Sequence, residues 1–171
     1  TGEVIYDGLY HFFRAYYFYN LTLKFGDIPY SESLAGESKG QFTPKYDSQE
    51  NVFVGILDEL KESNDELAQA AVKNETIDGD IIYNGNAGKW QKLVNSFRLK
   101  VLMTLSHKGQ VGSHNVKQEF LQIAGLPLIT NNSENGQLSY IDQEGNRYPQ
   151  FNAQWSGFYM DKTFIDRLAE R

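Results

Sequence analysis

Apolar side chains recur at helical spacing in four stretches of the chain. Between residues 6 and about 24 they fall at steps of three and four in two adjacent stripes, which predicts a central helix with contacts on more than one side. The expected inward face is Leu9, Phe13, Tyr16, Asn20 and Leu23, and the second stripe is Tyr6, Tyr10, Tyr17 and Leu21. Gly26 and Pro29 predict the end of this helix, because glycine suits the left-handed position after a helix and proline prevents resumption.

Three further helices follow from the same periodicity. The second starts after Asp47, which has the spacing of a capping box with Glu50, and continues to about residue 71. Its apolar face is Val52, Phe53, Ile56, Leu57, Leu60 and Leu67. The third runs from about 87 to 107, with the face Trp90, Leu93, Val94, Phe97, Val101 and Leu105. A shorter fourth helix spans 116–124, with Phe120 and Ile123 inward.

The segments outside these helices lack regular periodicity. Residues 30–46 are predicted to form a surface loop. Residues 126–159 are rich in Asn, Gly and Ser, and turn signals at 132–136 and 142–146 flank the short alternating run LSYI. This pattern predicts a long irregular loop or a small hairpin near the C-terminus, followed by a fifth helix near Asp161. The chain is therefore expected to be all-α, and stacked helical hairpins are one arrangement that the pattern allows.

Composition narrows the class of protein. The 171 residues suit one domain, so we expect residues 1–171 to form a single helical domain. The formal charge of −6 disfavours nucleic acid as a partner, and the absence of cysteine excludes disulfides and thiolate metal sites. No apolar run approaches the roughly 18 residues of a membrane span. The chain begins without Met and ends within a helical pattern, so we expect it to be a piece of a longer polypeptide.

Residues that often carry catalysis or bind metals are not arranged as sites. None of His11, His107 and His114 lies three or four residues from another histidine, so no metal site and no cofactor are predicted. The segment DGDIIYNGN, residues 78–86, fails as a calcium loop because Ile82 occupies a ligand position and Lys89 replaces the closing Glu. We interpret it as a polar turn whose Asn86 caps the next helix. The carboxylates Asp58, Glu59, Glu62, Asp65 and Glu66 are interpreted as a solvated helix face.

Aromatic residues make up 14% of the chain and divide into two groups. The rings of the first helix obey helical spacing and are interpreted as core. The rings in the irregular C-terminal segment have no helical face to explain them, and they are Tyr140, Tyr148, Trp155, Phe158 and Tyr159. Such rings stack on the apolar faces of sugars, and they serve equally well as a lid folded over a core. Both interpretations stay open.

Three blocks in order resemble the SusD/RagB family of outer-membrane nutrient-binding lipoproteins of Bacteroidetes. They are FRAYYFYNLTLKFGDIPYSES, PKYDSQENVFVGILDEL and DGDIIYNGNAGKWQKLVNSFRLKVLMTLS, and they span about two thirds of the chain. The resemblance implies a fold of hairpins like tetratricopeptide repeats, with Arg14 and Arg98 pairing with loop carboxylates or carbonyls. It also implies a cell-surface protein held at the outer membrane by a lipid anchor that is absent from this chain.

The same resemblance implies a function without catalysis. Such proteins capture oligosaccharides, or in some members peptides, and deliver them to a SusC-like TonB-dependent transporter. In this chain the expected ligand contacts are Trp155, Tyr148, Tyr140 and Tyr159. Two alternatives remain: a helical adaptor whose exposed rings dock a protein or peptide, and a glycan hydrolase, for which the sequence offers no convincing pair of carboxylates.

Overall fold

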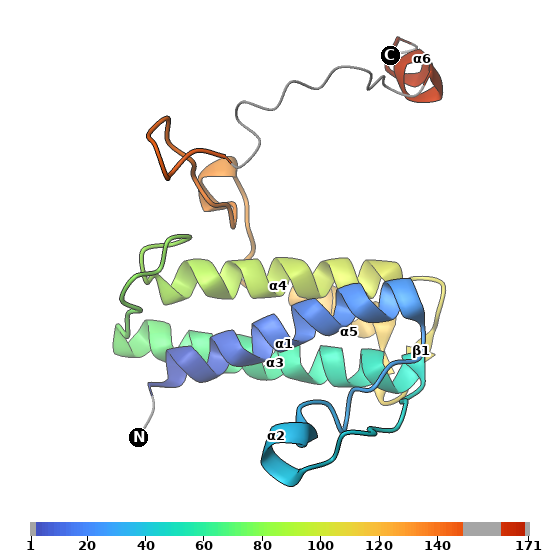
Figure 1. Ribbon diagram of the computed structural model, residues 1–171. Coiled ribbons are helices and arrows are strands. Elements are labelled where there is room, and N and C mark those ends of the chain that lie inside the picture. The colour runs from blue at the N-terminus through green and yellow to red at the C-terminus, as the bar shows by residue number, and fades with distance from the viewer. Residues whose placement is uncertain (1–2, 149–161, 170–171) are drawn as a thin grey trace. The chain divides into compact units, whose positions relative to one another are not determined.

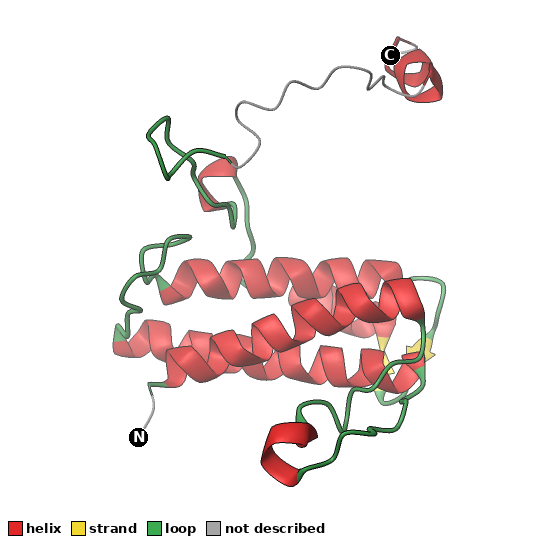
Figure 2. Cartoon of the chain, viewed as in Figure 1, coloured by secondary structure: helices red, strands yellow, loops and turns green. Residues whose placement is uncertain are grey.

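Helices form all the long regular elements in the described part of the chain. The structure is a computed structural model that describes residues 3–148 and 162–169. It divides into two compact units, Thr1–Gln137 and Leu138–Arg171. The first unit contains α1 (Val4–Phe25), α2 (Ala35–Lys39), α3 (Gln49–Lys73), α4 (Ala87–Thr104), β1 (Gln110–Val111), β2 (His114–Asn115), α5 (Val116–Ile123) and the 3-10 helix η1 (Asn132–Glu134). The second contains α6 (Lys162–Ala169) (Figure 2).

The long helices α1, α3 and α4 lie side by side and run in alternating directions (Figure 1). Helix α3 packs against both α1 and α4, and α5 packs against α4. Apart from the short α2, helices that follow one another in the sequence are therefore neighbours in space, which is typical of stacked helical hairpins. The predicted all-α fold of stacked hairpins resembling tetratricopeptide repeats is confirmed.

Helix α1 is buried along a row that alternates steps of three and four. Its members are Ile5, Gly8, Phe12, Ala15, Tyr19 and Thr22. The small residues allow a close approach to α3, since a Cβ on Gly8 would lie 2.8 Å from Cγ of Leu67. The hydroxyl of Ser63 on α3 also donates a 2.6 Å hydrogen bond to the carbonyl of Gly8. The row therefore joins α1 to α3 at short range.

The predicted inward face of α1 is wrong except at Leu9, which is partly buried against the core, although the helix itself is confirmed. Phe13 and Tyr16 are each 41% exposed and Leu23 is 46% exposed. The second predicted stripe is exposed as well, and it consists of Tyr6, Tyr10, Tyr17 and Leu21. Rings fill so many positions of this helix that their spacing does not select a face. The small residues of the buried row select it, because they let the backbones approach.

The apolar faces predicted for the next two helices are confirmed. Every predicted core residue of α3 is buried, and on α4 only Leu93 is partly exposed. The predicted capping box before α3 is wrong. Ser48 is the N-cap and accepts a bond from the backbone N–H of Asn51, whereas Asp47 accepts bonds from Tyr30 and Ser31. Asp47 therefore closes the preceding loop.

A two-stranded hairpin connects α4 to α5. The antiparallel register pairs Gln110 with Asn115 and Val111 with His114. The hairpin considered for residues 126–159 does not appear in its described part, 126–148, which is irregular apart from η1. Of the two predicted alternatives, residues 126–148 therefore form the long irregular loop and not the hairpin.

The loop between α1 and α3 is closed at its neck and exposes apolar side chains. Ile28 and Asp47 form an isolated antiparallel bridge at that neck. Leu34, Phe42 and Tyr46 are between 71% and 82% exposed, and the short α2 within this loop was not predicted.

Over residues 3–148 and 162–169, none of the helices has the length and apolar character needed to cross a membrane.

Candidate functional site

Two of the four predicted ligand-binding residues lie against each other in the second unit. The ring centroids of Tyr140 and Tyr148 are 5.3 Å apart, and their planes meet at 83°. The two residues are 47% and 51% exposed, so the edge of one ring meets the face of the other and both rings still reach solvent. The other two predicted residues, Trp155 and Tyr159, lie outside the described residues.

A tight turn brings these two rings together. The backbone N–H of Ile141 donates a 3.2 Å bond to the carbonyl of Asn146, and Gly145 supplies a φ of 83° that glycine adopts without strain. Arg147 Nε donates to Asp142 across the turn at 2.5 Å. The turn predicted at 142–146 is thus confirmed, and it sets the spacing of the pair.

The pair has the chemical features of a sugar contact. An edge-to-face arrangement exposes ring faces in two directions, and an aromatic face packs against the apolar C–H face of a sugar ring. The tyrosine hydroxyls and the neighbouring Asp142 and Arg147 are polar groups of the kind that bind sugar hydroxyls. The arrangement suits the binding of a polar ligand and supplies no nucleophile paired with a base.

The segment DGDIIYNGN is a loop anchored by one carboxylate. Asp80 accepts hydrogen bonds from the backbone N–H groups of Ile82, Tyr83 and Gly85 and from Nε1 of Trp90, at 2.8 to 3.2 Å. Burial opposes ionisation of this group, but the hydrogen bonds outweigh burial and lower the pKa of Asp80. A carboxylate engaged by four N–H donors is a structural anchor, as expected for a polar turn.

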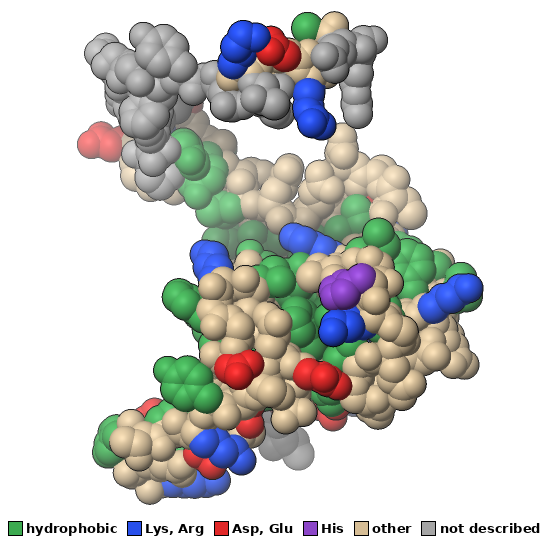
Figure 3. Space-filling view, turned by 90° about the vertical axis from the view of Figure 1, so that its right-hand side faces the viewer, with side chains coloured by type: hydrophobic (Ala, Val, Ile, Leu, Met, Phe, Trp, Pro, Cys, Tyr) green, Lys and Arg blue, Asp and Glu red, His purple; other side chains and the backbone are tan. Residues whose placement is uncertain are grey.

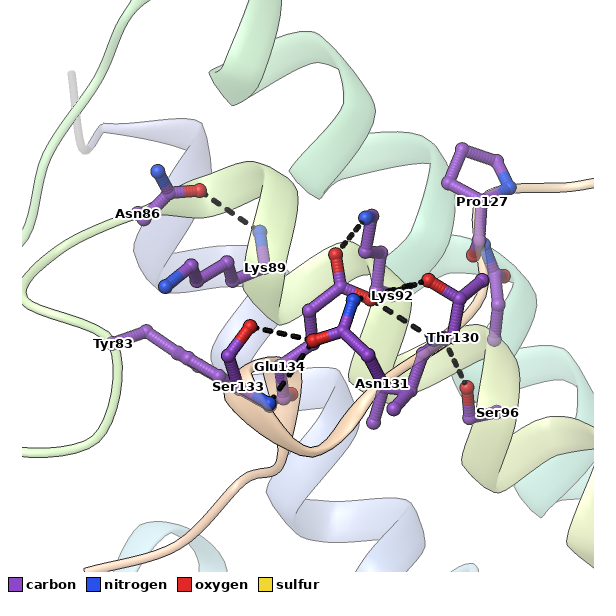
Figure 4. A network of polar contacts seen from close by, with 12 residues as sticks. Tyr83, Asn86, Lys89, Lys92, Ser96, Pro127, Thr130, Asn131, Ser133 and Glu134 are labelled. Atoms are coloured by element: carbon purple, nitrogen blue, oxygen red, sulfur yellow. Dashed lines mark hydrogen bonds and ion pairs between the residues drawn. The ribbon is translucent and has the colours of Figure 1, made fainter.

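Figure 4 shows how the segment after α5 is held to α4. Glu134 forms an ion pair with Lys92 and accepts a 2.9 Å bond from the backbone N–H of Thr130. Its own carbonyl accepts a 2.7 Å bond from the hydroxyl of Tyr83. The hydrogen bond from Lys92, with those from Thr130, lowers the pKa of Glu134 to about 2.

Two further bonds complete this attachment. Ser96 accepts from the N–H of Ile129 at 3.0 Å, and Asn95 donates to the carbonyl of Pro127 at 3.0 Å. Asn86 accepts a 2.9 Å bond from the N–H of Lys89, which confirms the predicted cap of α4. The segment from Pro127 to Glu134 is therefore fixed along α4.

A second polar cluster joins α1, α3 and the loop that follows α1. Glu59 pairs with His11, accepts from Nε of Arg14 at 2.7 Å, and accepts from the hydroxyl of Tyr30 at 3.3 Å. Its side chain is only 15% exposed, so its assignment to a solvated face is wrong. Glu66 is likewise turned toward α1, and burial raises its pKa. The exposed carboxylates of the predicted face are Asp58, Glu62 and Asp65.

The remaining cluster is also structural. His114 Nδ1 lies 2.6 Å from Glu119, which accepts a 3.2 Å bond from Arg98. The expected partner of Arg98 was a loop group, and the carboxylate comes instead from α5. Arg14 does reach a loop carbonyl, that of Tyr30, at 3.2 Å. Within residues 3–148 and 162–169, no three His, Asp or Glu side chains are arranged to hold a metal ion.

Comparison with known proteins gives a family match over nearly the whole chain. The SusD-like family profile, described as "Starch-binding associating with outer membrane", matches residues 3–171. A crystal structure of a SusD homolog from Bacteroides fragilis NCTC 9343 is 60% identical with a TM-score of 0.89, and the match covers 98% of this chain and 35% of that one. A search among curated proteins finds no match.

Two other solved structures extend the comparison. An outer membrane protein of Bacteroides vulgatus ATCC 8482 with a proposed part in nutrient binding is 50% identical, with a TM-score of 0.88 over 99% of this chain and 37% of that one. A chitin-binding protein is 29% identical, with a TM-score of 0.51 over 66% of this chain and 22% of that one. The chain thus spans little more than a third of the length of its two most similar relatives named here.

Proposed function

Because the chain belongs to the SusD-like family of proteins associated with the outer membrane, we propose that it is part of a protein that captures oligosaccharides at the cell surface. The observation that carries this proposal is the exposed, perpendicular pair Tyr140 and Tyr148. The ligand class is supported by the starch-binding description of the family and by the chitin-binding relative. Trp155 and Tyr159 are proposed as further contacts.

The proposed protein binds its ligand without breaking a bond. This is supported by the positions of the side chains that most often act as acids, bases or nucleophiles. His11 with Glu59 links two helices, and His114 with Glu119 joins the hairpin to α5. Both pairs hold packed elements of the first unit together, which is a structural use of these side chains.

The ligand is proposed to pass to a SusC-like TonB-dependent transporter. The supporting observation is the family match, together with relatives about three times as long as this chain. We propose that residues 1–171 are the helical part of a longer, lipid-anchored polypeptide. Its other parts would supply the anchor and additional ligand contacts.

A helical adaptor for a protein or peptide is the second candidate. It is favoured by the loop between α1 and α3, where Leu34, Phe42 and Tyr46 are exposed although the loop itself is closed by polar bonds. Exposed rings on a preorganised loop are typical of protein interfaces. The surface loop was predicted from sequence, but its exposed Leu34, Phe42 and Tyr46 were not singled out because they follow no period.

Calorimetry on the complete protein separates these functions. We expect starch or chitin oligosaccharides to release heat, and Tyr140→Ala or Tyr148→Ala to weaken binding roughly tenfold, because one ring contact contributes about 1.5 kcal/mol. Tyr10→Ala is the matched control, since Tyr10 is 55% exposed on α1. Heat with a protein or peptide alone would favour the adaptor, and release of cleaved sugar would favour a hydrolase.

A further inference from the structure

A hollow of about 490 Å³ lies between the end of α4 and the start of α5. Its apolar walls come from both helices and consist of Leu102, Met103, Val116, Phe120 and Leu121. The volume is within the range of small-molecule pockets, about 300 to 1,000 Å³. Met103 and Leu121 are 58% and 65% exposed, so the apolar wall is open to solvent.

The two ends of this hollow differ in chemistry. The hairpin β1–β2 joins the helices, so the residues nearest to it, 106–109 and 116–117, line one end. That end carries His107, Lys108 and Lys117. On α5, Leu121 lies one helical turn beyond Lys117, about 6 Å along the axis at 1.5 Å per residue, and Leu102 and Met103 lie in the last turn of α4 before the residues of the basic end. The hollow therefore has a basic end and an apolar end.

The charge at the basic end is uncompensated. The lining contains no Asp or Glu, although the chain carries a formal charge of −6. Within the described part of the chain, His107, Lys108 and Lys117 form no ion pair, and the nearby Glu119 is engaged by Arg98 and His114. Figure 3 views this end of the unit and shows a histidine and lysine or arginine side chains among hydrophobic ones.

The helix dipoles explain only part of this arrangement. Lys108 and His107 follow α4, where the negative end of the helix dipole attracts cations. Lys117 lies in the first turn of α5, where the dipole disfavours a cation. A bound group that carries negative charge would stabilise all three side chains.

We propose that this hollow binds a single-chain organic anion, a medium-chain carboxylate. The carboxylate pairs with Lys108 and Lys117, and the hydrocarbon chain lies over Leu102, Phe120 and the flexible side chain of Met103. A neutral sugar fits less well because the walls between the two ends are apolar. The site belongs to the first unit and does not depend on glycan capture.

Titration calorimetry with decanoate and with the neutral decanamide, both at concentrations where they are monomeric, tests the role of the charge. Decanoate is expected to bind at least tenfold more tightly than the neutral amphiphile, which has the same tail. Octanoate, two methylenes shorter, is expected to bind at least fivefold more weakly than decanoate. Equal binding of the charged and neutral amphiphiles would overturn the proposal.

Variants at each end locate the ligand. Lys108→Glu with Lys117→Glu should weaken decanoate binding at least tenfold. The matched control, Lys24→Glu with Lys39→Glu, makes the same charge change at exposed positions in the last turns of α1 and α2 and should leave affinity unchanged. Met103→Ser with Leu121→Ser alters only exposed wall residues and should abolish the preference for the longer chain.

Two outcomes would overturn the proposal. One is unchanged decanoate affinity after reversal of both lysines, with the fold confirmed by circular dichroism. The other is binding by the 171-residue chain and none by the complete protein. In that case the hollow is a packing surface that the rest of the polypeptide covers.

Discussion

The indole Nε1–H of Trp90 donates a 2.8 Å hydrogen bond to the carboxylate of Asp80. Trp90 lies in the first turn of α4 and is 4% exposed, so this bond ties the loop before α4 to the buried core. The ring also contacts Phe12 of α1 at a centroid distance of 6.0 Å. The loop, α4 and α1 are therefore connected through one side chain.

Replacement of Asp80 should destabilise the helical unit. Asp80→Ala removes the acceptor of three backbone N–H groups and of the indole, and we expect a loss of about 3 kcal/mol in the free energy of unfolding. Urea unfolding followed by tryptophan fluorescence measures this loss. Asp78→Ala, at an exposed position two residues earlier, should change stability by less than about 0.5 kcal/mol. Equal effects of the two variants would contradict the assigned role.

Gly55 is predicted to be intolerant of a side chain. A Cβ there would lie 2.3 Å from Cε1 of Tyr30, whose ring is held between Arg14 and Phe18. We expect Gly55→Ala to cost about 1 to 2 kcal/mol, although alanine is the better helix former by about 1 kcal/mol.

The control for this variant is Gly88→Ala in the first turn of α4. Its Cβ would meet only Oδ1 of Asn86, at 3.4 Å, so the change should be neutral or stabilising by up to about 1 kcal/mol. Thermal unfolding of both variants gives the comparison. A stabilising Gly55→Ala would show that Tyr30 moves aside freely.

The hydroxyl of Tyr30 should lose its proton at a higher pH than that of an ordinary tyrosine. Burial raises the pKa of Tyr30 to about 12, and the charge of Glu59 adds to this shift. Its neutral form is favoured in the folded state, so the associated stability is present below pH 10 and is lost as pH rises toward 12.

Ultraviolet difference titration measures this ionisation, with Tyr30→Phe identifying the signal among the eleven tyrosines. Glu59→Gln should lower the pKa of Tyr30 toward 10, because the neighbouring negative charge is removed. No change in Glu59→Gln would mean that burial alone sets the value.

Glu134 should lose its attachment only in strong acid. Its pKa is lowered from 4.5 to about 2, chiefly by the hydrogen bond from Lys92, so its contribution to stability is present above pH 4.5 and is lost as pH falls toward 2. The amide proton of Thr130, which donates to this carboxylate, reports the titration by NMR. Lys92→Ala should raise the midpoint toward 4.5, and Lys89→Ala should leave it near 2.

The position of each long helix could be predicted from sequence, but the face of α1 could not be predicted from rings alone. The buried row includes Gly8, Ala15 and Thr22 at steps of seven, and Ile5, Phe12 and Tyr19 at the same step. Both series are visible in the sequence. The first was missed because glycine, alanine and threonine were not counted as core residues, although small side chains permit the closest helix contacts. The second was missed because rings also fill the neighbouring positions of the helix.

The candidate site was predictable only in part. The turn at 142–146 follows from its glycine and polar residues, and it brings Tyr140 to Tyr148. The role of Glu59 was hidden because a carboxylate on a helix looks solvated until the neighbouring helix is known to supply His11 and Arg14. Such pairings join distant parts of the chain, which no local pattern specifies.

Helix α1 turns one row of side chains to the core and another to water. The outward tyrosines at positions 6, 10 and 17 contribute little to the packed row on the other side. Solubility and folding are therefore separable properties of this helix. Exchanging the outward rings for charged residues would change the colloidal behaviour of the chain while leaving its interior intact.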